Sequence, residues 1–192
     1  MRVRRLFSLI LVASLFITAH TGWTQNKPGV SIDVFKTVKP GQWVQLEGVP
    51  QRDFTVMATE IKVLTGDFQD DDWEAFGTVR AVQKENKQFD LLLVKMKVNA
   101  DTDFETEELN GKFKGIVDLK PGMLVEIEGT YLKDGTFLVN EVQDETKGKA
   151  DEAGTVTFRG KVEKIDPVKR SVTVMGTKFT ITSNTQTKSA VK

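Results

Sequence analysis

Apolar and polar residues alternate along most of the chain beyond its N-terminal region. Residues 44–47 read VQLE, and the stretches 55–63, 124–128 and 136–143 follow the same pattern. Alternation with a period of two, in stretches rich in Val, Ile, Thr and Phe, is typical of strands with one buried face. The stretch 102–113 comes closest to a helical period and has room for one or two turns. The pattern therefore predicts an all-β fold.

One motif occurs twice in the chain. Residues 38–48 read VKPGQWVQLEG, and residues 119–129, which lie 81 positions later, read LKPGMLVEIEG. A second pair of segments, 77–102 and 160–185, matches at an offset of 83 positions, with glycine at the start and threonine at the end of each. Internal repetition identifies structural units. The first pair predicts a two-stranded hairpin, and the second pair predicts a three-stranded unit.

The two-stranded hairpin and the three-stranded unit are half-modules, and they alternate along the chain. Only in the central pair does the three-stranded unit come before the hairpin, which is the usual order in a five-stranded unit. Five short strands, split three and two by a brief irregular connection, predict an OB-like Greek-key barrel at 74–145. We expect the end segments, 30–67 and 154–187, to form a second such barrel that is circularly permuted. Either end segment alone would leave unpaired strand edges and half a core. In this arrangement the strand at 44–47 pairs with the strand at 156–162.

A linear array is the competing arrangement, in which each end segment adds separately to the central barrel. The permuted arrangement needs two connections, and the polar stretches 65–74 and 144–154 are suited to that role. Two such connections predict hinge-like motion between the barrels. The cleft between the barrels is then the expected binding surface.

Turn residues separate the predicted strands. An Asp-Gly pair between two strands tolerates the positive φ that a tight hairpin needs. Glycine adopts positive φ readily because it has no Cβ. The predicted turn positions are Gly41, Gly48, Gly122, Gly129, Asp134 and Gly135.

The residues that carry the repeat also carry a resemblance to a known family. The pattern GTV…V…F…V…V…T over 77–102 is followed by LKPGMLVEIEGTYLKDGTFLVNEV at 119–142. Together they resemble the module of a bacterial family of exported, OB-like domains of unknown function, and the resemblance covers nearly all of 38–187. It implies the fold and export. It supplies no catalytic residue, because the matching positions are turns and core in that family. This chain differs from the family's usual module order, because it begins and ends with a half-module.

Residues 1–25 predict a cleaved secretory signal peptide. Arg2, Arg4 and Arg5 precede an apolar run at 6–19, which is shorter than the ~20 residues needed to span a bilayer. A retained N-terminal anchor is the alternative. We expect a cleaved signal helix and an exported protein, periplasmic or extracellular, with no membrane span after cleavage.

The composition argues against an enzyme. The chain has no cysteine, and its one histidine, His20, lies within the predicted signal peptide. Nucleophilic triads need an imidazole base, and zinc, copper or non-haem iron sites normally use His or Cys. The sequence contains no glycine-rich phosphate loop. We therefore expect a non-catalytic protein that needs no cofactor.

A run of carboxylates suggests an alternative function. Asp70, Asp71, Asp72 and Glu74 could offer oxygen ligands to a hard cation such as Ca²⁺. Their spacing fits no EF-hand loop. A solvated linker is the simpler interpretation of these acids, and a calcium-binding exported protein is the alternative.

Positive charge is concentrated towards the C-terminal end. Residues 154–192 contain eight Lys and Arg against two acids, whereas residues 26–153 contain 16 against 25. Aromatic residues that could stack on bases are few in this region, and export disfavours nucleic acid as a ligand. We expect binding to an envelope protein, a glycan or a surface polymer. The candidate binding residues are Trp73, Arg159, Lys161, Lys169 and Arg170.

Overall fold

The computed structural model describes residues 33–106 and 113–189, and these residues form an all-β fold, as the sequence predicts. The predicted signal peptide at 1–25 lies outside the described residues. In the described part of the chain, no helix is long and apolar enough to cross a membrane.

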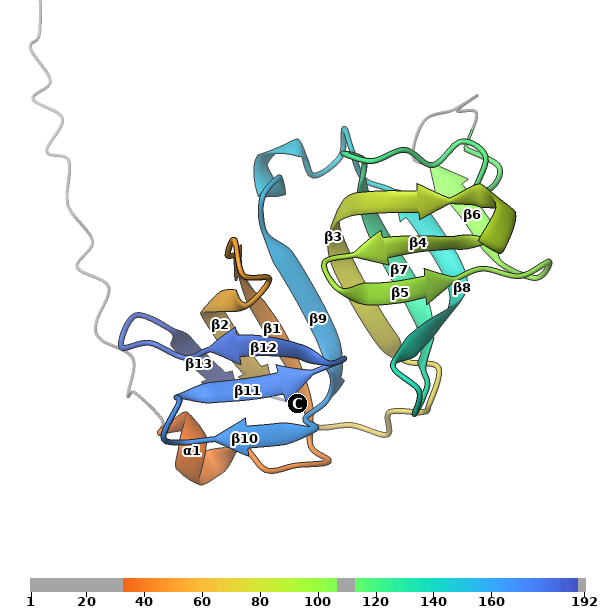
Figure 1. The fold of residues 1–192 in the computed structure, drawn as a ribbon. Coiled ribbons are helices and arrows are strands. Elements are labelled where there is room, and N and C mark those ends of the chain that lie inside the picture. Colours follow the sequence, from red (N-terminus) through yellow and green to blue (C-terminus); the bar gives the residue numbers. More distant parts are fainter. Residues whose placement is uncertain (1–32, 107–112, 190–192) are drawn as a thin grey trace, which may run out of the picture.

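Thirteen strands in the described residues belong to one hydrogen-bonded sheet that curves on itself (Figure 1). The strands are β1 (Trp43–Pro50), β2 (Val56–Val63), β3 (Trp73–Gln83), β4 (Gln88–Leu91), β5 (Val94–Lys97), β6 (Asp103–Thr106), β7 (Leu124–Tyr131), β8 (Thr136–Asp144), β9 (Val156–Lys161), β10 (Lys164–Asp166), β11 (Ser171–Val174), β12 (Thr177–Thr180) and β13 (Gln186–Ser189). The helical segments are short, and they are α1 (Val34–Thr37), η1 (Lys84–Asn86) and η2 (Ala150–Glu152).

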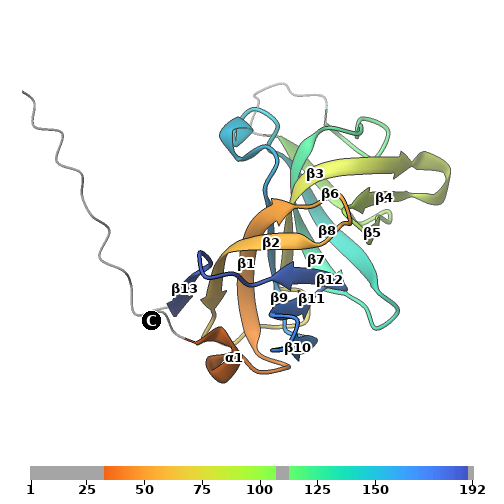
Figure 2. The ribbon, with the colours of Figure 1, turned by 60° about the vertical axis from the view of Figure 1, so that its left-hand side comes forward.

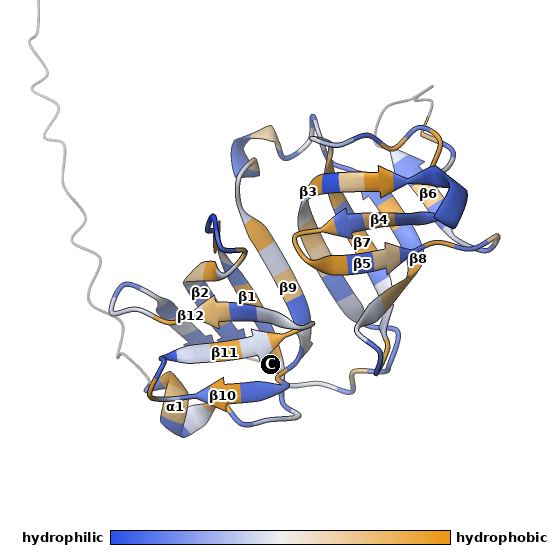
Figure 3. Cartoon of the chain, in the orientation of Figure 1, coloured by the Kyte–Doolittle hydropathy of each residue, from blue (hydrophilic) through white to orange (hydrophobic). Residues whose placement is uncertain are grey.

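Strands β3, β4, β5, β8 and β7 pair in a closed ring. The β3–β4, β4–β5, β7–β8 and β3–β7 pairs are antiparallel, and the parallel pair of β5 and β8 closes the ring. Strand β6 pairs with another part of β8. Most strands carry both apolar and polar residues (Figure 3), and the apolar side chains of Phe89, Met96, Ile127 and Phe137 are fully buried. The alternation in the sequence thus corresponds to an inner and an outer face.

The two ends of the chain pair with each other. Strand β1 runs antiparallel to β9, from Trp43 opposite Lys161 to Gly48 opposite Val156. Strand β2 pairs with β1, and β12 and β13 lie parallel to β2 (Figure 2). The predicted pairing of the strand at 44–47 with the strand at 156–162 is confirmed. The linear array is wrong, because the two end segments are partners of each other.

Equivalent residues of the repeat occupy equivalent positions in the sheet. The β3–β7, β5–β8 and β6–β8 ladders correspond in register to the β9–β1, β12–β2 and β13–β2 ladders. A side-chain hydrogen bond is repeated as well. Thr102 Oγ1 donates to Val139 O at 2.8 Å, and Thr185 Oγ1 donates to Ala58 O at 2.8 Å. The repeat therefore extends from strand pairing to individual side-chain contacts.

A further ladder joins the central ring to the end strands. Strands β3 and β9 pair antiparallel with Ala75 opposite Phe158, and these two residues are one repeat offset, 83 positions, apart. An approximate twofold axis therefore passes through this pair, as in the isologous contact of a dimer. Trp73 and Glu74, which the sequence placed in a linker, belong to β3. Hydrogen-bonded pairing therefore links the two groups of strands, in addition to the two predicted connections.

Four of the predicted turn glycines fall into two classes. Gly41 and Gly122 have φ of +83° and +92° in turns, as predicted. Gly48 and Gly129 lie inside β1 and β7, each where the register shifts against the next strand, so the prediction of turns there is wrong. A Cβ on Gly129 would lie 2.1 Å from the carbonyl oxygen of Leu138. Glycine is needed at these bulges because the partner backbone approaches closely.

We expect Gly129→Val to lower the free energy of unfolding by about 1–3 kcal/mol, which is the usual effect of overpacking a well-packed region. Gly115→Ala is the matched control, because a Cβ at Gly115 has no atom within 4 Å. Denaturant unfolding of both variants measures the difference. Equal stability of wild type and Gly129→Val would show that β7 and β8 do not approach each other so closely.

The outer faces of equivalent ladders differ in charge. On the central ring, Glu128 lies directly opposite Glu141. The pKa of Glu141 is raised, first by burial and then by the negative charges of neighbours, Glu105 first among them. In the end strands, the equivalent of Glu141 is Glu60, which forms an ion pair of 2.5 Å with Lys188, the equivalent of Glu105. Glu47 lies opposite Glu60 in the end strands as well. Like charges across a ladder destabilise a sheet, and among the described residues only the end face has a lysine, Lys188, that offsets this cost.

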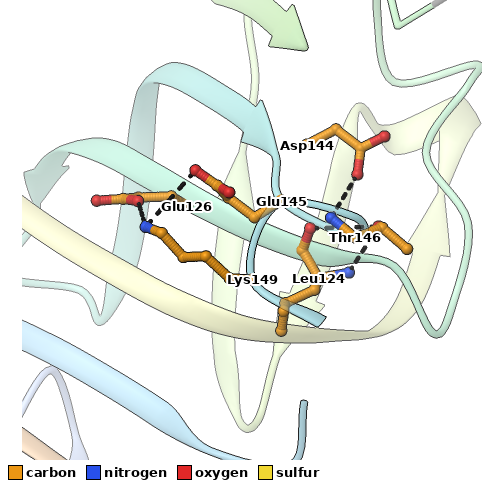
Figure 4. A network of polar contacts seen from close by, with 6 residues as sticks. All are labelled: Leu124, Glu126, Asp144, Glu145, Thr146 and Lys149. Carbon is orange, nitrogen blue, oxygen red and sulfur yellow. Dashed lines mark hydrogen bonds and ion pairs between the residues drawn. The ribbon is translucent and has the colours of Figure 1, made fainter. Parts of the chain in front are cut away.

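Lys149 neutralises another part of this acidic face (Figure 4). Its ammonium group is ion-paired with Glu126 and lies 3.5 Å from Oε1 of Glu145. Beside it, Thr146 Oγ1 accepts a hydrogen bond of 3.1 Å from the backbone N–H of Leu124. These contacts hold the segment that follows β8 against β7.

We expect Glu105→Lys to stabilise the protein at pH 7 by roughly 0.2–1 kcal/mol, the range for favourable cross-strand pairs. The substitution removes a like charge from Glu141 and lowers the pKa of Glu141. A lowered carboxyl pKa stabilises the folded state above that pKa, so the gain should disappear as the pH falls through the pKa of Glu141.

The reciprocal variant is Lys188→Glu, which removes the ion pair with Glu60 and should lower stability at neutral pH. Thermal unfolding of both variants between pH 3 and pH 7 gives the comparison. A gain from Glu105→Lys that is the same at both ends of this pH range would contradict the electrostatic explanation.

Candidate functional site: two grooves beside the β3–β9 ladder

Two grooves flank the ladder that joins the halves of the sheet. The first, called the apolar groove, has a volume of about 390 Å³ and is lined by Pro50, Gln51, Phe54, Thr78, Val79, Arg80, Leu92, Gly154, Thr155 and Val156. The second, called the acidic groove, has a volume of about 500 Å³ and is lined by Trp73, Tyr131, Leu132, Lys133, Asp134, Gly135 and Glu163. Each groove takes residues from both halves of the sheet.

The two grooves are equivalent under the repeat, but their chemistry differs. Phe54 and Gly135 are related by the offset of 81 positions, and Arg80 and Glu163 by the offset of 83. The approximate twofold axis through Ala75 and Phe158 therefore relates one groove to the other. At these two positions the apolar groove has an aromatic ring and a cation, whereas the acidic groove has a glycine and a carboxylate.

Arg80 is held in place in the apolar groove. Its Nε donates a hydrogen bond of 2.8 Å to the carbonyl oxygen of Leu92, and its Nη2 donates one of 2.6 Å to Oδ2 of Asp90. Its guanidinium lies 5.6 Å from the centre of the Phe54 ring, within the range of a cation–π contact. Since Arg80 belongs to β3 and Phe54 to the β1–β2 turn, this contact crosses between the halves of the sheet.

Phe54 has an unusual backbone for its position. Its φ is +62°, a left-handed conformation that L side chains rarely adopt, and 41% of the residue is exposed. In the equivalent turn of the acidic groove, Gly135 takes the same role with φ of +84°. Both turns are closed in the same way, because Asp53 accepts a hydrogen bond from the N–H of Thr55, as Asp134 does from Thr136. Residues in sparsely populated backbone conformations are concentrated at functional positions.

The predicted turn at Asp134 and Gly135 is confirmed, and it forms one wall of the acidic groove. Burial, followed by the charges of Glu163 and Asp134, raises the pKa of Tyr131 to about 12. Glu163 Oε1 accepts a hydrogen bond of 3.0 Å from the backbone N–H of Gly176, so part of the carboxylate is already engaged.

Trp73, a candidate binding residue within the polar stretch 65–74, is buried. It retains 6% exposure and stands in a row of aromatic rings, 5.1 Å from Trp43 and 5.4 Å from Tyr131. The six-membered ring of Trp73 also covers Gly160, where an added Cβ would lie 2.3 Å from it. Trp73 therefore packs the start of β3 against the end strands and is not available to a partner.

Two of the predicted basic residues lie beside Trp73 and are paired with acids of this chain. Arg159 forms an ion pair with Glu74 across the β3–β9 ladder, and its Nε donates a hydrogen bond of 3.2 Å to the carbonyl oxygen of Asp72. The ammonium nitrogen of Lys161 lies 2.9 Å from Oδ1 of Asp70, and it also lies over the ring of Trp43. These pairs connect the linker to the end strands.

The other two predicted basic residues, Lys169 and Arg170, lie in the turn between β10 and β11. Arg170 has φ of +48°, and its Nε donates a hydrogen bond of 3.2 Å to the carbonyl oxygen of Ile181. Its guanidinium lies 5.4 Å from the centre of the Phe35 ring. The five candidate residues are therefore divided between the ladder and a separate turn.

The acids of the predicted calcium alternative have partners within the chain. Asp70 and Glu74 pair with lysine and arginine side chains, and Asp72 Oδ2 accepts a hydrogen bond of 2.6 Å from the N–H of Gln69. The hydrogen bond from Lys161 lowers the pKa of Asp70. Among the described residues, no three acidic, His or Cys side chains converge on one point. The fourth acid, Asp71, is exposed, so the geometry favours no metal centre here.

Sequence reasoning overlooked Phe54 and Arg80. A signal was present, because Asp53 matches Asp134 in the repeat and the next position changes from glycine to phenylalanine. Arg80 gave no such signal on its own. Its partner Asp90 and its contact with Phe54 come from segments 10 or more positions away, which only the folded sheet brings together.

The comparisons with known proteins agree with the repeat. No curated protein and no solved structure matches the chain. A family described as a domain of unknown function, DUF5666, matches residues 12–62, 76–143 and 159–191. The last two segments contain most of the central ring and most of the C-terminal strands, and the first contains β1 and most of β2. The match covers more than half of the chain, and the chain therefore belongs to the DUF5666 family.

Proposed function

We propose that this protein is a non-catalytic binding protein of the cell envelope, built from two OB-like five-stranded barrels. The complete barrel is formed by residues 74–145, and the permuted one by 30–67 together with 154–187. Export is proposed from the basic and apolar character of residues 1–25, and the periplasm or the extracellular space is the expected location.

The matching registers of the two halves support the second barrel. Strands β9 and β10 are separated by two residues, and both of these are paired. Val162 N–H donates to the carbonyl oxygen of Gln42 at 2.9 Å, and Glu163 N–H donates to that of Thr173 at 2.9 Å. One long, bent strand can therefore pair with β1 at its start and with β11 at its end, as β3 pairs with β7 and β4. This bent strand is the feature that would close the permuted barrel.

The composition supports a role without catalysis. The only histidine lies in the predicted signal peptide and cysteine is absent from the whole sequence. The mature chain would therefore lack the imidazole base of Ser-His-Asp sites and the thiol of Cys-His sites. A partner that is a protein, a glycan or a surface polymer remains the proposed ligand class.

The apolar groove is the proposed binding site, and Phe54 is the observation that carries the proposal. A phenylalanine in a left-handed turn lowers stability relative to glycine, and an exposed ring gains little from burial. The sister turn has glycine at this position. A ring that lowers the stability of its own turn fits a residue whose main contact is with a partner, where exposed aromatic residues act as anchors.

A photo-reactive phenylalanine analogue, p-benzoylphenylalanine, tests the site at position 54. Irradiation in the envelope of the producing cell should give a discrete cross-linked product. The same analogue at position 168 is the control, because Val168 is 94% exposed and lies in the β10–β11 turn away from the groove lining. The product at 54 should not form from position 168.

Competition makes the test specific. An excess of unlabelled wild-type protein should abolish the cross-link at 54, whereas Phe54→Gly should compete about tenfold less well, because it lacks the ring that the partner buries. Phe54→Gly should still fold, since glycine fits the left-handed turn. Identical products from positions 54 and 168, or equal competition by Phe54→Gly, would remove the groove as the binding site.

A further inference from the structure

We propose that the apolar groove binds a protein segment in which an apolar side chain lies next to a carboxylate. Phe54 and Leu92 would contact the side chain, and Arg80 would pair with the carboxylate. This inference rests on the proposed function, and it chooses a protein as partner over a glycan or another polymer.

The polar groups of the groove favour a protein over a glycan. The hydroxyl of Thr155 donates to the carbonyl oxygen of Glu152 at 2.7 Å, and the amide of Gln51 donates to that of Val49 at 2.9 Å. A glycan presents many hydroxyl groups, and each loses its bonds to water unless the site replaces them. Because these two side chains are engaged within the chain, the groove would replace only part of those bonds. An apolar side chain needs no such replacement.

The apolar wall comes from both halves of the sheet. Phe54 is 41% exposed, and Leu92 is half-buried with φ of +53°. The β1–β2 turn and the β4–β5 turn therefore present apolar groups around one groove. Burial of a single apolar side chain between such walls is the usual core of a small protein contact.

Arg80 is the one charged residue among the described residues that line this groove. A guanidinium has five N–H donors, and the contacts with Leu92 and Asp90 use one at Nε and one at Nη2. The remaining donors suit a carboxylate, which arginine binds in a planar, bidentate geometry. Because Asp90, Leu92 and the Phe54 ring already orient the group, little side-chain freedom would be lost on binding.

The sister groove has neither feature at the equivalent positions, although Tyr131 and Lys133 also line it, and this difference argues that the apolar groove is specialised. Glycine replaces the ring of Phe54, and Glu163 replaces the guanidinium of Arg80. A carboxylate of a ligand would be repelled by Glu163. The acidic groove therefore serves as an internal control on the same molecule.

Binding can be measured by amide NMR shifts of the full mature chain, which detect weak complexes. The probes are the dipeptide acetyl-Leu-Phe with a free C-terminal carboxylate, the same dipeptide as a carboxamide, and the trisaccharide of N-acetylglucosamine. The free acid should shift the amides of Gln51, Phe54, Leu92 and Thr155 and bind about tenfold more tightly than the carboxamide, as expected for a charge-assisted contact. The trisaccharide should leave these amides unchanged.

Two variants separate the contacts. Arg80→Gln should make the free acid and the carboxamide bind equally, and Phe54→Gly should weaken both. Glu163→Gln in the acidic groove is the control and should alter neither affinity. Should Arg80→Gln lose the native spectrum because Asp90 loses its partner, the comparison of acid and carboxamide on the wild-type chain decides the question.

Equal affinity of wild type for the acid and the carboxamide overturns the inference. So do groove shifts caused by the trisaccharide in place of the peptides, or the absence of groove shifts with all three probes. If these results appear while the cross-link at position 54 is still competed by wild type and not by Phe54→Gly, the proposed function stands and only its ligand class is wrong.

Discussion

Strand β9 is hydrogen-bonded along both of its edges, and the rest of the structure depends on this double pairing. One edge pairs with β1 and joins the two ends of the chain, and the other pairs with β3 and joins the ends to the central ring. Without the first edge, the N-terminal hairpin would keep only the parallel pairing of β2 with β12 and β13. Without the pairing of β9 with β3, the central ring and the end strands would be connected mainly by the acidic segment before β3 and the segment after β8. Gly160 makes the crowding around β9 possible, because the ring of Trp73 occupies the space of a side chain there.

The contact between β3 and β9 resembles a dimer interface within one chain. In a true homodimer, both grooves beside such a contact would be identical, because one sequence makes both. Here the two copies have separate sequences and can diverge. The apolar groove has Phe54 and Arg80, whereas the acidic groove has a glycine and a carboxylate at the equivalent positions. The charges on the outer ladders have diverged too, since Lys188 balances one face and Glu105 adds to the charge of the other.

Much of the fold follows from local features of the sequence. Alternation of apolar and polar residues predicts strands because a sheet has two faces, and the repeat predicts that the two halves use the same pairing. The union of the chain ends follows from the need to pair open edges. Gly41 and Gly122 were predictable as turns from their Pro-Gly context. Gly48 and Gly129 were not, because their requirement is the distance to a neighbouring strand and leaves no local mark beyond the glycine itself.

The candidate site was less accessible to sequence reasoning. Trp73 and the acids around it look like a solvated linker, since nothing local shows that Gly160 offers space for the ring or that Arg159 and Lys161 face the acids. These relations join positions more than 80 residues apart, and burial depends on such neighbours. The amino-acid order alone specified the strands, their repeat and the absence of cysteine. The tertiary structure decided which charges are neutralised, which aromatic rings are buried and where the grooves lie, because each of these depends on distances between segments that are remote in the chain.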